Sequence, residues 1–506
     1  MNFKKAFCLF LSVIMIITAF SAVAVSAKAE SGMPDGAFPG GQPPERPDGE
    51  APGEPPEGMG GPGSGMGTPP EGAPGGDMGT PPDGGMGGAG GPGGMPGGGP
   101  SSGSDIDYSG AVEITTADSQ DSLTYETSSV DQSALLISTA EDVTVANPTV
   151  VKSGSSDGGD SCNFYGLNAA VLVKDGSTAT ITGGTITSDA DGANGVFSYG
   201  GNGGRNGAEG DGTTVIIHDT VITTTGSGSG GIMTTGGGTT YAYDLTVTTS
   251  GGSSAPIRTD RGGGTVHVDG GSYTSNGLGS PAIYSTADIT VENAVLTSNL
   301  SEGVCIEGKN SITLLNCDLS ASNTKCNGNA TFLDTIMIYQ SMSGDADSGT
   351  SSFTMTGGSL TSKNGHVFHV TNTNAVINLS GVEIRNEDAS GVLLSVCDDG
   401  WNGAGNVATL NADGQTLSGT ILVGSNSGLT LNLMNGSTLT GTVSGEIVNA
   451  KGATVSTEAG TVDVTLDSTS TWSLTADTYV SSFSGDTANI SFNGYTLYVD
   501  GVAVNP

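Results

Sequence analysis

Alternating apolar and hydroxyl side chains form one short pattern that recurs eight times within residues 177–386. In a representative copy, residues 179–188, Thr or Ser alternates with Ala or Ile on both sides of a bend. A period of two is typical of a strand and not of a helix. Every copy has Gly, Asn or Asp at the bend, because bends need a positive φ or a local side-chain hydrogen bond. The eight bend residues are Gly183, Asp219, Asp244, Gly270, Asn293, Asn316, Gly357 and Gly381.

Two apolar columns accompany the bends. Most copies are about 24 residues apart, which is the spacing of a solenoid whose repeats bury their apolar faces by stacking. The column two positions before the bend is Ile181, Ile217, Ala242, Val268, Val291, Leu314, Met355 and Leu379. The column three positions after the bend is Ile186, Ile222, Val247, Tyr273, Leu296, Leu319, Leu360 and Ile384. We expect both columns to point into one shared core.

A further strand follows each copy, at 196–199, 232–235, 256–259, 282–285, 304–307, 336–339, 366–369 and 392–395. Equivalent strands of successive coils would pair in parallel about 4.8 Å apart. The sequence therefore predicts an all-β fold, a single right-handed parallel β-helix. Two longer steps carry polar insertions at 200–212 and 326–349, which we expect to be loops on one face.

The pattern also predicts where the β-helix begins and ends. Short strands within 105–151 would form the first coils, and the β-helix would span 105–406. Residues 407–506 would supply further coils and a C-terminal cap, in which we expect Trp472, Tyr495 and Tyr498 to come together.

The first hundred residues are of a different kind. Residues 1–29 have Lys4 and Lys5 before an apolar run and a small-residue cleavage site, which is typical of a secretion signal. The alternative is an uncleaved membrane anchor. Residues 30–104 are acidic and rich in Gly, Pro and Met, which predicts a disordered spacer. We expect a secreted protein, extracellular or associated with the cell surface, with no membrane contact after signal cleavage.

The charge balance narrows the range of partners. Lys and Arg number 14 against 51 Asp and Glu, which gives a formal net charge of −37. Nucleic acid and anionic membranes are therefore excluded as partners. Solubility of a secreted protein explains this acidity, and binding of divalent cations is the alternative. We expect a monomer.

Arginine is rare in this chain, yet Arg258 and Arg261 lie only three positions apart, on either side of Asp260. By alternation Arg258 points away from the core, and Tyr284 is the equivalent residue one coil later. A guanidinium can bind a carboxylate with two hydrogen bonds, and a neighbouring ring can stack on a pyranose. The pattern predicts a ligand site for an acidic sugar at Arg258, Asp260, Arg261 and Tyr284. The alternative is that the arginines only pair with nearby acids.

A second candidate site lies at residues 189–195, where Asp189, Asp191 and Asn194 offer closely spaced oxygen atoms beside glycines. Loops of this kind wrap Ca²⁺, so calcium is the expected cofactor. An ordinary Asx-rich bend is the alternative.

The catalytic signal is weak. Asp398 and Asp399 are adjacent, but no complete set of hydrolase or lyase residues accompanies them. We expect His218 and His267 to face solvent and His369 to lie inward beside the apolar core.

Four segments carry a family resemblance: DADGANGVFSYG at 189–200, RTDRGGG at 258–264, SPAIYSTAD at 280–288 and EGVCIEGKN at 302–310. They resemble secreted adhesin-like β-helix proteins of Gram-positive gut anaerobes. Together with the Gly-Pro-Met-rich spacer they are more loosely similar to a pectate-lyase-like family that binds cellulose and acidic sugars with Ca²⁺ and lacks lyase activity.

The residues and the resemblance together imply an extracellular, non-catalytic adhesin or carbohydrate-binding protein. Its partner would be a polysaccharide or a cell-surface glycan, with an acidic polysaccharide and calcium as the specific form of this hypothesis. A calcium-dependent, pectate-type polysaccharide lyase is the alternative, with Arg258 or Arg261 as proton acceptor. A purely structural surface-layer role is a third possibility, which predicts self-association and no ligand.

Overall fold

The computed structural model describes residues 106–203, 209–401 and 405–504. The chain divides into two units, of which Met1–Thr80 lies outside the described residues and Pro81–Pro506 contains all of them. The predicted secretion signal at 1–29 and the predicted spacer at 30–104 also lie outside the described residues and stay predictions.

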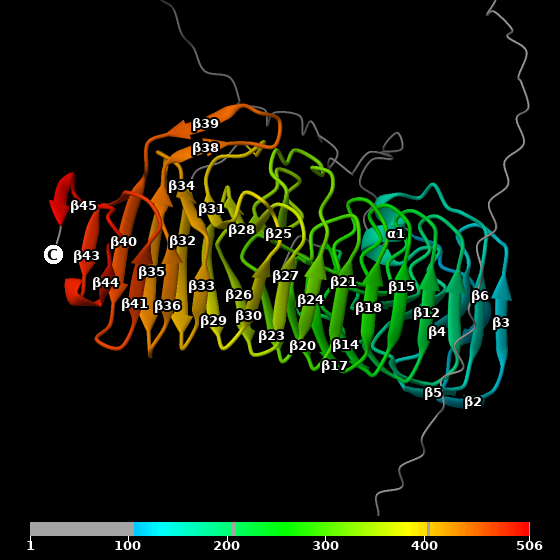
Figure 1. The fold of residues 1–506 in the computed structure, drawn as a ribbon. Helices are drawn as coiled ribbons and strands as arrows, with labels where there is room; N and C mark the ends of the chain where they lie inside the picture. The colour runs from blue at the N-terminus through cyan, green and yellow to red at the C-terminus, as the bar shows by residue number, and fades with distance from the viewer. Residues whose placement is uncertain (1–105, 204–208, 402–404, 505–506) are drawn as a thin grey trace, which may run out of the picture. The chain divides into compact units, whose positions relative to one another are not determined.

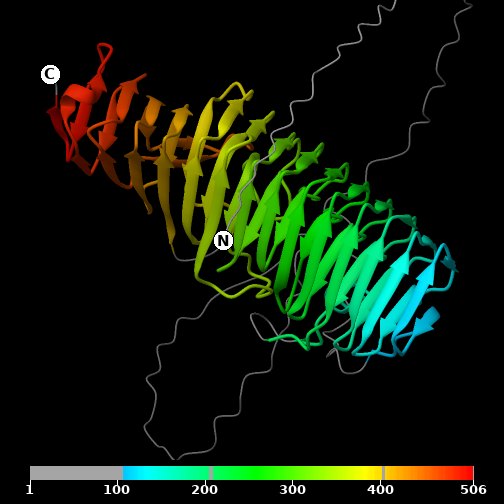
Figure 2. The same ribbon diagram turned by 90° about the horizontal axis from the view of Figure 1, so that it is seen from below.

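The second unit is a parallel β-helix, as the periodicity predicts. Most coils contribute one strand to each of three parallel sheets, so neighbours within a sheet are three elements apart in the chain. Figure 1 shows the coils following one another in sequence order, from the cyan end to the red end, and Figure 2 shows the same order from below. The predicted ten-residue pattern is two strands, one on each side of the bend.

Sheet A contains β1 (Gly110–Ile114), β4 (Ser133–Ser138), β7 (Val171–Lys174), β10 (Val196–Tyr199), β13 (Ile232–Thr235), β16 (Ile257–Thr259), β19 (Ile283–Ser285), β22 (Val304–Glu307), β25 (Asp334–Tyr339), β28 (His366–Thr371), β31 (Val392–Val396), β34 (Thr420–Val423) and β37 (Val443–Ser444). Sheet B contains β2 (Asp118–Asp121), β5 (Asp142–Ala146), β8 (Thr178–Thr182), β11 (Thr214–His218), β14 (Gly238–Tyr243), β17 (Gly264–Asp269), β20 (Asp288–Glu292), β23 (Ser311–Leu315), β26 (Thr350–Thr356), β29 (Asn374–Ser380), β32 (Asn406–Asp413), β35 (Ser427–Met434), β40 (Thr461–Leu466) and β43 (Ser482–Ser484).

Sheet C contains β3 (Thr124–Thr127), β6 (Thr149–Lys152), β9 (Thr185–Ser188), β12 (Val221–Thr224), β15 (Thr246–Thr249), β18 (Ser272–Ser275), β21 (Val295–Ser298), β24 (Asp318–Ala321), β27 (Ser359–Ser362) and β30 (Glu383–Asn386). In the later coils a separate parallel sheet provides the third strand, with β33 (Thr416–Ser418), β36 (Thr438–Gly441), β41 (Thr471–Leu474) and β44 (Ile490–Ser491). The remaining strands are the hairpin of β38 (Glu446–Val448) and β39 (Thr454–Thr457), and the terminal set of β42 (Thr478–Val480), β45 (Leu497–Val499) and β46 (Val502–Val504).

The core lies between the three sheets and runs through the coils. Both predicted apolar columns belong to one continuous cluster, with Ile217 and Ile222 completely buried and Ile384 packed against the cluster. All eight predicted bend residues have a positive φ, from 51° at Asp219 and Asp244 to 75° at Gly270. Asn and Asp tolerate this conformation better than other residues with a Cβ, which explains why these residue types share the column with Gly.

The outer face of sheet A is covered by other parts of the chain. The helix α1 (Asp160–Tyr165), which the sequence pattern does not predict, packs Phe164 and Tyr165 against Leu172 and Phe197 of this face. Farther along, Ile447 of the β38–β39 hairpin belongs to a cluster with Leu422 and Cys397. The predicted strand at 336–339 lies within β25, which divides the predicted insertion at 326–349 into two loops.

The C-terminal coils continue the core, but the predicted aromatic cluster does not form. Trp472 is completely buried in the core, whereas Tyr498 stacks on Tyr479 with ring centroids 4.7 Å apart. Tyr495 is 41% exposed. Within the residues that the structure describes, no helix has the length and the apolar character needed to cross a bilayer.

Candidate functional site

The predicted Arg258 site lies on the outer face of sheet A, where one residue per coil forms a column in register. The column is Leu136, Leu172, Phe197, Met233, Arg258, Tyr284, Cys305, Met337, His369, Ser395 and Leu422. Arg258 is therefore directed away from the core, as alternation predicts, and Tyr284 is its neighbour on the next coil. The Arg258 guanidinium carbon lies 6.0 Å from the centre of the Tyr284 ring. Arg258 is nevertheless only 9% exposed, because other parts of the chain cover this face.

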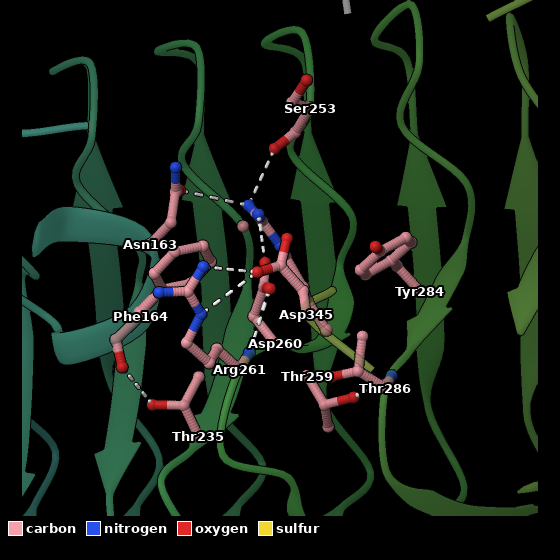
Figure 3. A network of polar contacts seen from close by, with 12 residues as sticks. Asn163, Phe164, Thr235, Ser253, Thr259, Asp260, Arg261, Tyr284, Thr286 and Asp345 are labelled. Carbon is pink, nitrogen blue, oxygen red and sulfur yellow. Dashed lines mark hydrogen bonds and ion pairs between the residues drawn. The ribbon is translucent and has the colours of Figure 1, made fainter. Parts of the chain in front are cut away.

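Both arginines of the motif are engaged in ion pairs, of which Figure 3 shows the one between Arg261 and Asp345. Arg258 Nη2 lies 2.8 Å from Asp260 Oδ2, and its Nη1 donates to the carbonyl oxygen of Ser253 at 3.0 Å. Arg261 Nη2 lies 2.5 Å from Oδ1 of Asp345, which comes from the loop after β25. The Arg261 guanidinium also lies over the ring of Phe164 on α1, 4.2 Å from its centre. The network thus fastens α1 and the 340–349 loop to sheet A.

Burial and the ion pairs act in opposite directions on the charged groups of this network. Asp260 is 4% exposed, and desolvation raises its pKa to about 6 even though Arg258 opposes the shift. The pKa of Arg261 is raised despite its burial, because Asp345 holds the charged form. The geometry matches the interpretation that the arginines pair with nearby acids.

Tyr284 is held by a similar network. Its hydroxyl donates to Glu307 Oε2 at 2.7 Å, and the Tyr339 hydroxyl donates to the same oxygen at 3.1 Å. The Ser341 hydroxyl donates to the other oxygen of Glu307. Burial raises the pKa of Glu307. The structure thus brings Arg258, Asp260, Arg261 and Tyr284 together, but their polar groups already have protein partners.

In the predicted calcium loop, the side-chain oxygens of Asp191 and Asn194 accept hydrogen bonds from the next coil. Asp191 Oδ1 accepts the backbone N–H of Ser227 at 2.7 Å, and Asn194 Oδ1 accepts that of Gly230 at 2.8 Å. Asp189 is exposed. Both bonds tie one coil to the next. Within the described residues, no three His, Cys, Asp or Glu side chains are grouped so that they could hold a metal ion.

A chain of polar groups that the sequence does not reveal lies farther along sheet A. Ser395 Oγ is 2.7 Å from Nδ1 of both His366 and His369, and His369 Nε2 is 3.3 Å from Asp399 Oδ2. The prediction for His369 is wrong in its position, because this residue is buried on the outer side of sheet A and not beside the core. No sequence motif could have found the group, since only the register of β28 and β31 brings it together.

This group resembles a hydrolytic triad in composition but is closed to solvent. Ser395 and His369 are completely buried, and the Phe332 ring lies over His369 with centroids 4.8 Å apart. Asp399 Oδ1 accepts hydrogen bonds from both the backbone N–H and the hydroxyl of Thr331 at 2.6 Å. The group therefore anchors the loop before β25.

The outer face of sheet B presents its side chains to solvent. On β11, β14 and β17, two pairs of rings stack across neighbouring coils. The rings of His218 and Tyr243 lie 4.6 Å apart with planes 10° from parallel, and those of Tyr241 and His267 lie 5.3 Å apart with planes 7° from parallel. His267 is exposed and the other three are partly exposed, which confirms the prediction that His218 and His267 face solvent. Together these four residues are named the ring platform.

The same face continues as a ladder of amides. Asn432 donates to Asn411 at 2.8 Å, Asn411 donates to Asn378 at 2.9 Å, and Asn378 donates to the Thr354 hydroxyl at 3.1 Å. Thr290 and Thr313 stand in register between the ladder and the ring platform. A shallow groove of about 360 Å³ follows the ladder, lined by Thr354, Thr356, Asn378, Leu379, Ser380, Asn411, Asp413 and Met434.

The strands of sheet B contain neither Lys nor Arg at any position. Acidic residues such as Asp269, Glu292 and Asp413 flank the ladder and the platform. The open face is therefore polar, aromatic and free of fixed positive charge within its strands.

No family model, no curated protein and no solved structure matches this chain.

Proposed function

We propose that this protein is a secreted, non-catalytic polysaccharide-binding protein whose ligand lies along the outer face of sheet B. The observation that carries the proposal is the ring platform. Stacking already covers one face of each ring, so a sugar would contact the parts of the rings that stay exposed, together with the Tyr hydroxyls and the imidazole nitrogens. Because stacking holds the rings in place, little entropy is lost on binding.

The amide ladder supports the same proposal. Each Asn side chain has two donors and an acceptor with two lone pairs, so a ladder bond uses only part of its capacity. The remaining groups and the Thr hydroxyls offer hydrogen bonds to sugar hydroxyls at every coil. Coils repeat about every 4.8 Å, so an extended polymer that lies along the axis would meet equivalent groups repeatedly.

Charge favours a neutral polysaccharide over the acidic one that the arginine motif suggests. Arg258 and Arg261 are paired beneath the covering of sheet A, and the open face of sheet B has no Lys or Arg in its strands. A chain of formal charge −37 would repel a polyuronate unless cations bridged the two.

A glycan array tests the proposal, with neutral and uronate polysaccharides probed in the presence of calcium and in EDTA. We expect binding to neutral polysaccharides that EDTA does not abolish. Absence of binding to any glycan or cell surface would refute the function. Release of unsaturated uronides from polygalacturonate would instead establish the lyase alternative.

A further inference from the structure

Two buried acidic side chains lie level with each other on neighbouring coils, outside the ring platform. Val304 of β22 pairs with Ile336 of β25, so Glu302 lies level with Asp334. The backbone N–H of Gly303 donates to the Thr335 carbonyl oxygen at 2.8 Å, which fixes this register. Glu302 and Asp334 are each only 1% exposed.

In the described part of the chain, no donor or cation stabilises the carboxylate of Asp334. Among the residues that the structure describes, neither of its oxygens has a hydrogen-bond donor. In the same described part of the chain, the side-chain oxygen of the fully buried Asn323 has no partner either. A buried carboxylate without donors is strongly destabilising, so each such group in a native protein requires an explanation.

Asn323 connects the two acids. Its Nδ2 donates to the backbone carbonyl oxygen of Asp334 at 3.2 Å, and its side chain lies close enough to Glu302 to oppose part of the rise in the pKa of that carboxyl, which burial causes. The Ser301 hydroxyl donates to the Glu302 carboxylate. The three side chains therefore form one group, in which Asp334 and the Asn323 oxygen supply acceptors that nothing in the described part of the chain satisfies.

The charge of this group is also uncompensated by the described residues. No Lys, Arg or His of the described ranges forms an ion pair with Glu302 or Asp334. The charged groups that act on Asp334 are the carboxylates of Glu302 and Asp399, which together with burial raise its pKa well above the usual range. Either a bound proton or a bound cation is therefore needed to compensate the charge of the pair.

We propose that Glu302, Asp334 and the side-chain oxygen of Asn323 bind one divalent, oxygen-preferring cation of the calcium class. Two carboxylates balance the charge of such an ion, and carboxylate and amide oxygens are its preferred ligands. The ion would join the coil of β22 to that of β25 and fix the loop between β24 and β25, which carries Asn323. The site is separate from the loop of Asp189, Asp191 and Asn194, and it does not depend on the proposed glycan binding.

A shared proton is the competing explanation, because two close carboxylates can also be stabilised when one is neutral. The two explanations differ at neutral pH. A cation site loses stability when a ligand is made neutral, whereas Asp334→Asn relieves a pair that shares a proton.

The test uses the full chain, refolded in EDTA or in Ca²⁺ alone. Metal content is measured by mass spectrometry, the melting temperature by calorimetry, and backbone protection of residues 322–334 by hydrogen exchange. We expect about one Ca²⁺ per chain, a higher melting temperature in Ca²⁺, and protection of residues 322–334 that is lost in EDTA. The variants Glu302→Gln and Asp334→Asn should lose both the ion and the response.

The control is the double variant Asp189→Asn, Asp191→Asn, which should keep the ion and the response. The hydrogen-exchange comparison uses the wild type, so it remains decisive if a site variant fails to fold. Wild-type protein that contains no metal, with a melting temperature and exchange pattern indifferent to Ca²⁺, would overturn the proposal. Asp334→Asn protein that is more stable than the wild type would overturn it as well.

Discussion

Arg261 and Asp345 are separated by 84 positions in the sequence, yet Nη2 of the arginine lies 2.5 Å from Oδ1 of the aspartate. The contact joins the strand edge after β16 to the loop after β25, several coils away. Both side chains are largely buried, at 16% and 15% exposure. Long-range contacts of this kind hold loops over the outer face of sheet A and so shield its side chains from solvent.

Removing one partner should therefore loosen the covering loop. Asp345→Asn leaves a largely buried arginine without its anion, and we expect a loss of about 2 to 4 kcal/mol in the free energy of unfolding. Limited proteolysis should show faster cleavage within residues 340–349. The matched control is Lys309→Met, which removes a pair with Asp347 that is half-exposed on both sides and should cost no more than about 1 kcal/mol. Equal effects of the two variants would contradict the assigned role of Arg261 and Asp345.

Adjacent residues of β11 provide a direct test of the core. Ile217 is completely buried between the sheets, whereas Ile216 is partly exposed on the outer face of sheet B. We expect Ile217→Ala to cost about 2 to 5 kcal/mol through lost burial and the remaining cavity. Ile216→Ala should cost less than about 1 kcal/mol. Urea denaturation measures both values, and a reversed order would show that the register of the strand is wrong.

The success of the sequence in predicting the core and its failure on sheet A have the same physical origin. A side chain's direction within a coil depends on local alternation, so Ile181 and Ile217 could be assigned to the core from neighbours alone. Whether an outward side chain is exposed depends on which other segments of the chain lie over it. Arg258 is covered by α1 and by the loop that carries Asp345, and neither the helix nor that contact has a signal in the repeat.

The outer face of sheet B is the contrasting case, because its side chains stay exposed. The exposure of His218 and His267 follows from alternation because no other described part of the chain covers these strands. Their stacking on Tyr243 and Tyr241 could have been found from the sequence, since equal offsets from the bends place each pair in register. The group of Ser395, His369 and Asp399 had no such signal.

Acidification should destabilise the folded protein through the buried residue His366. Burial lowers the pKa of His366 to about 3, below the value of about 6.5 for an unfolded chain. The unfolded chain therefore binds the proton more tightly, so the stability contributed by neutral His366 is complete above pH 6.5 and is lost as the pH falls toward 3. Between pH 7.5 and 4.5 we expect wild type to lose about 2 to 3 kcal/mol more than His366→Asn.

Urea midpoints at the two pH values provide this comparison. The exposed residue His267 supplies the control, because His267→Asn should retain the acid sensitivity of the wild type. An equal loss in wild type and His366→Asn would show that the His366 ring gains its proton freely in the folded protein.

The most direct test of the account is the affinity of the ring platform for a neutral polysaccharide. Affinity electrophoresis or calorimetry would compare wild type with the double variant Tyr241→Ala, Tyr243→Ala, and with Thr248→Ala on the outer face of sheet C as a matched control. Because each ring contributes about 1 kcal/mol, the double variant should bind at least about tenfold more weakly, while Thr248→Ala binds as the wild type does. Unchanged affinity in a correctly folded double variant would contradict the claim that the open face of sheet B binds the glycan.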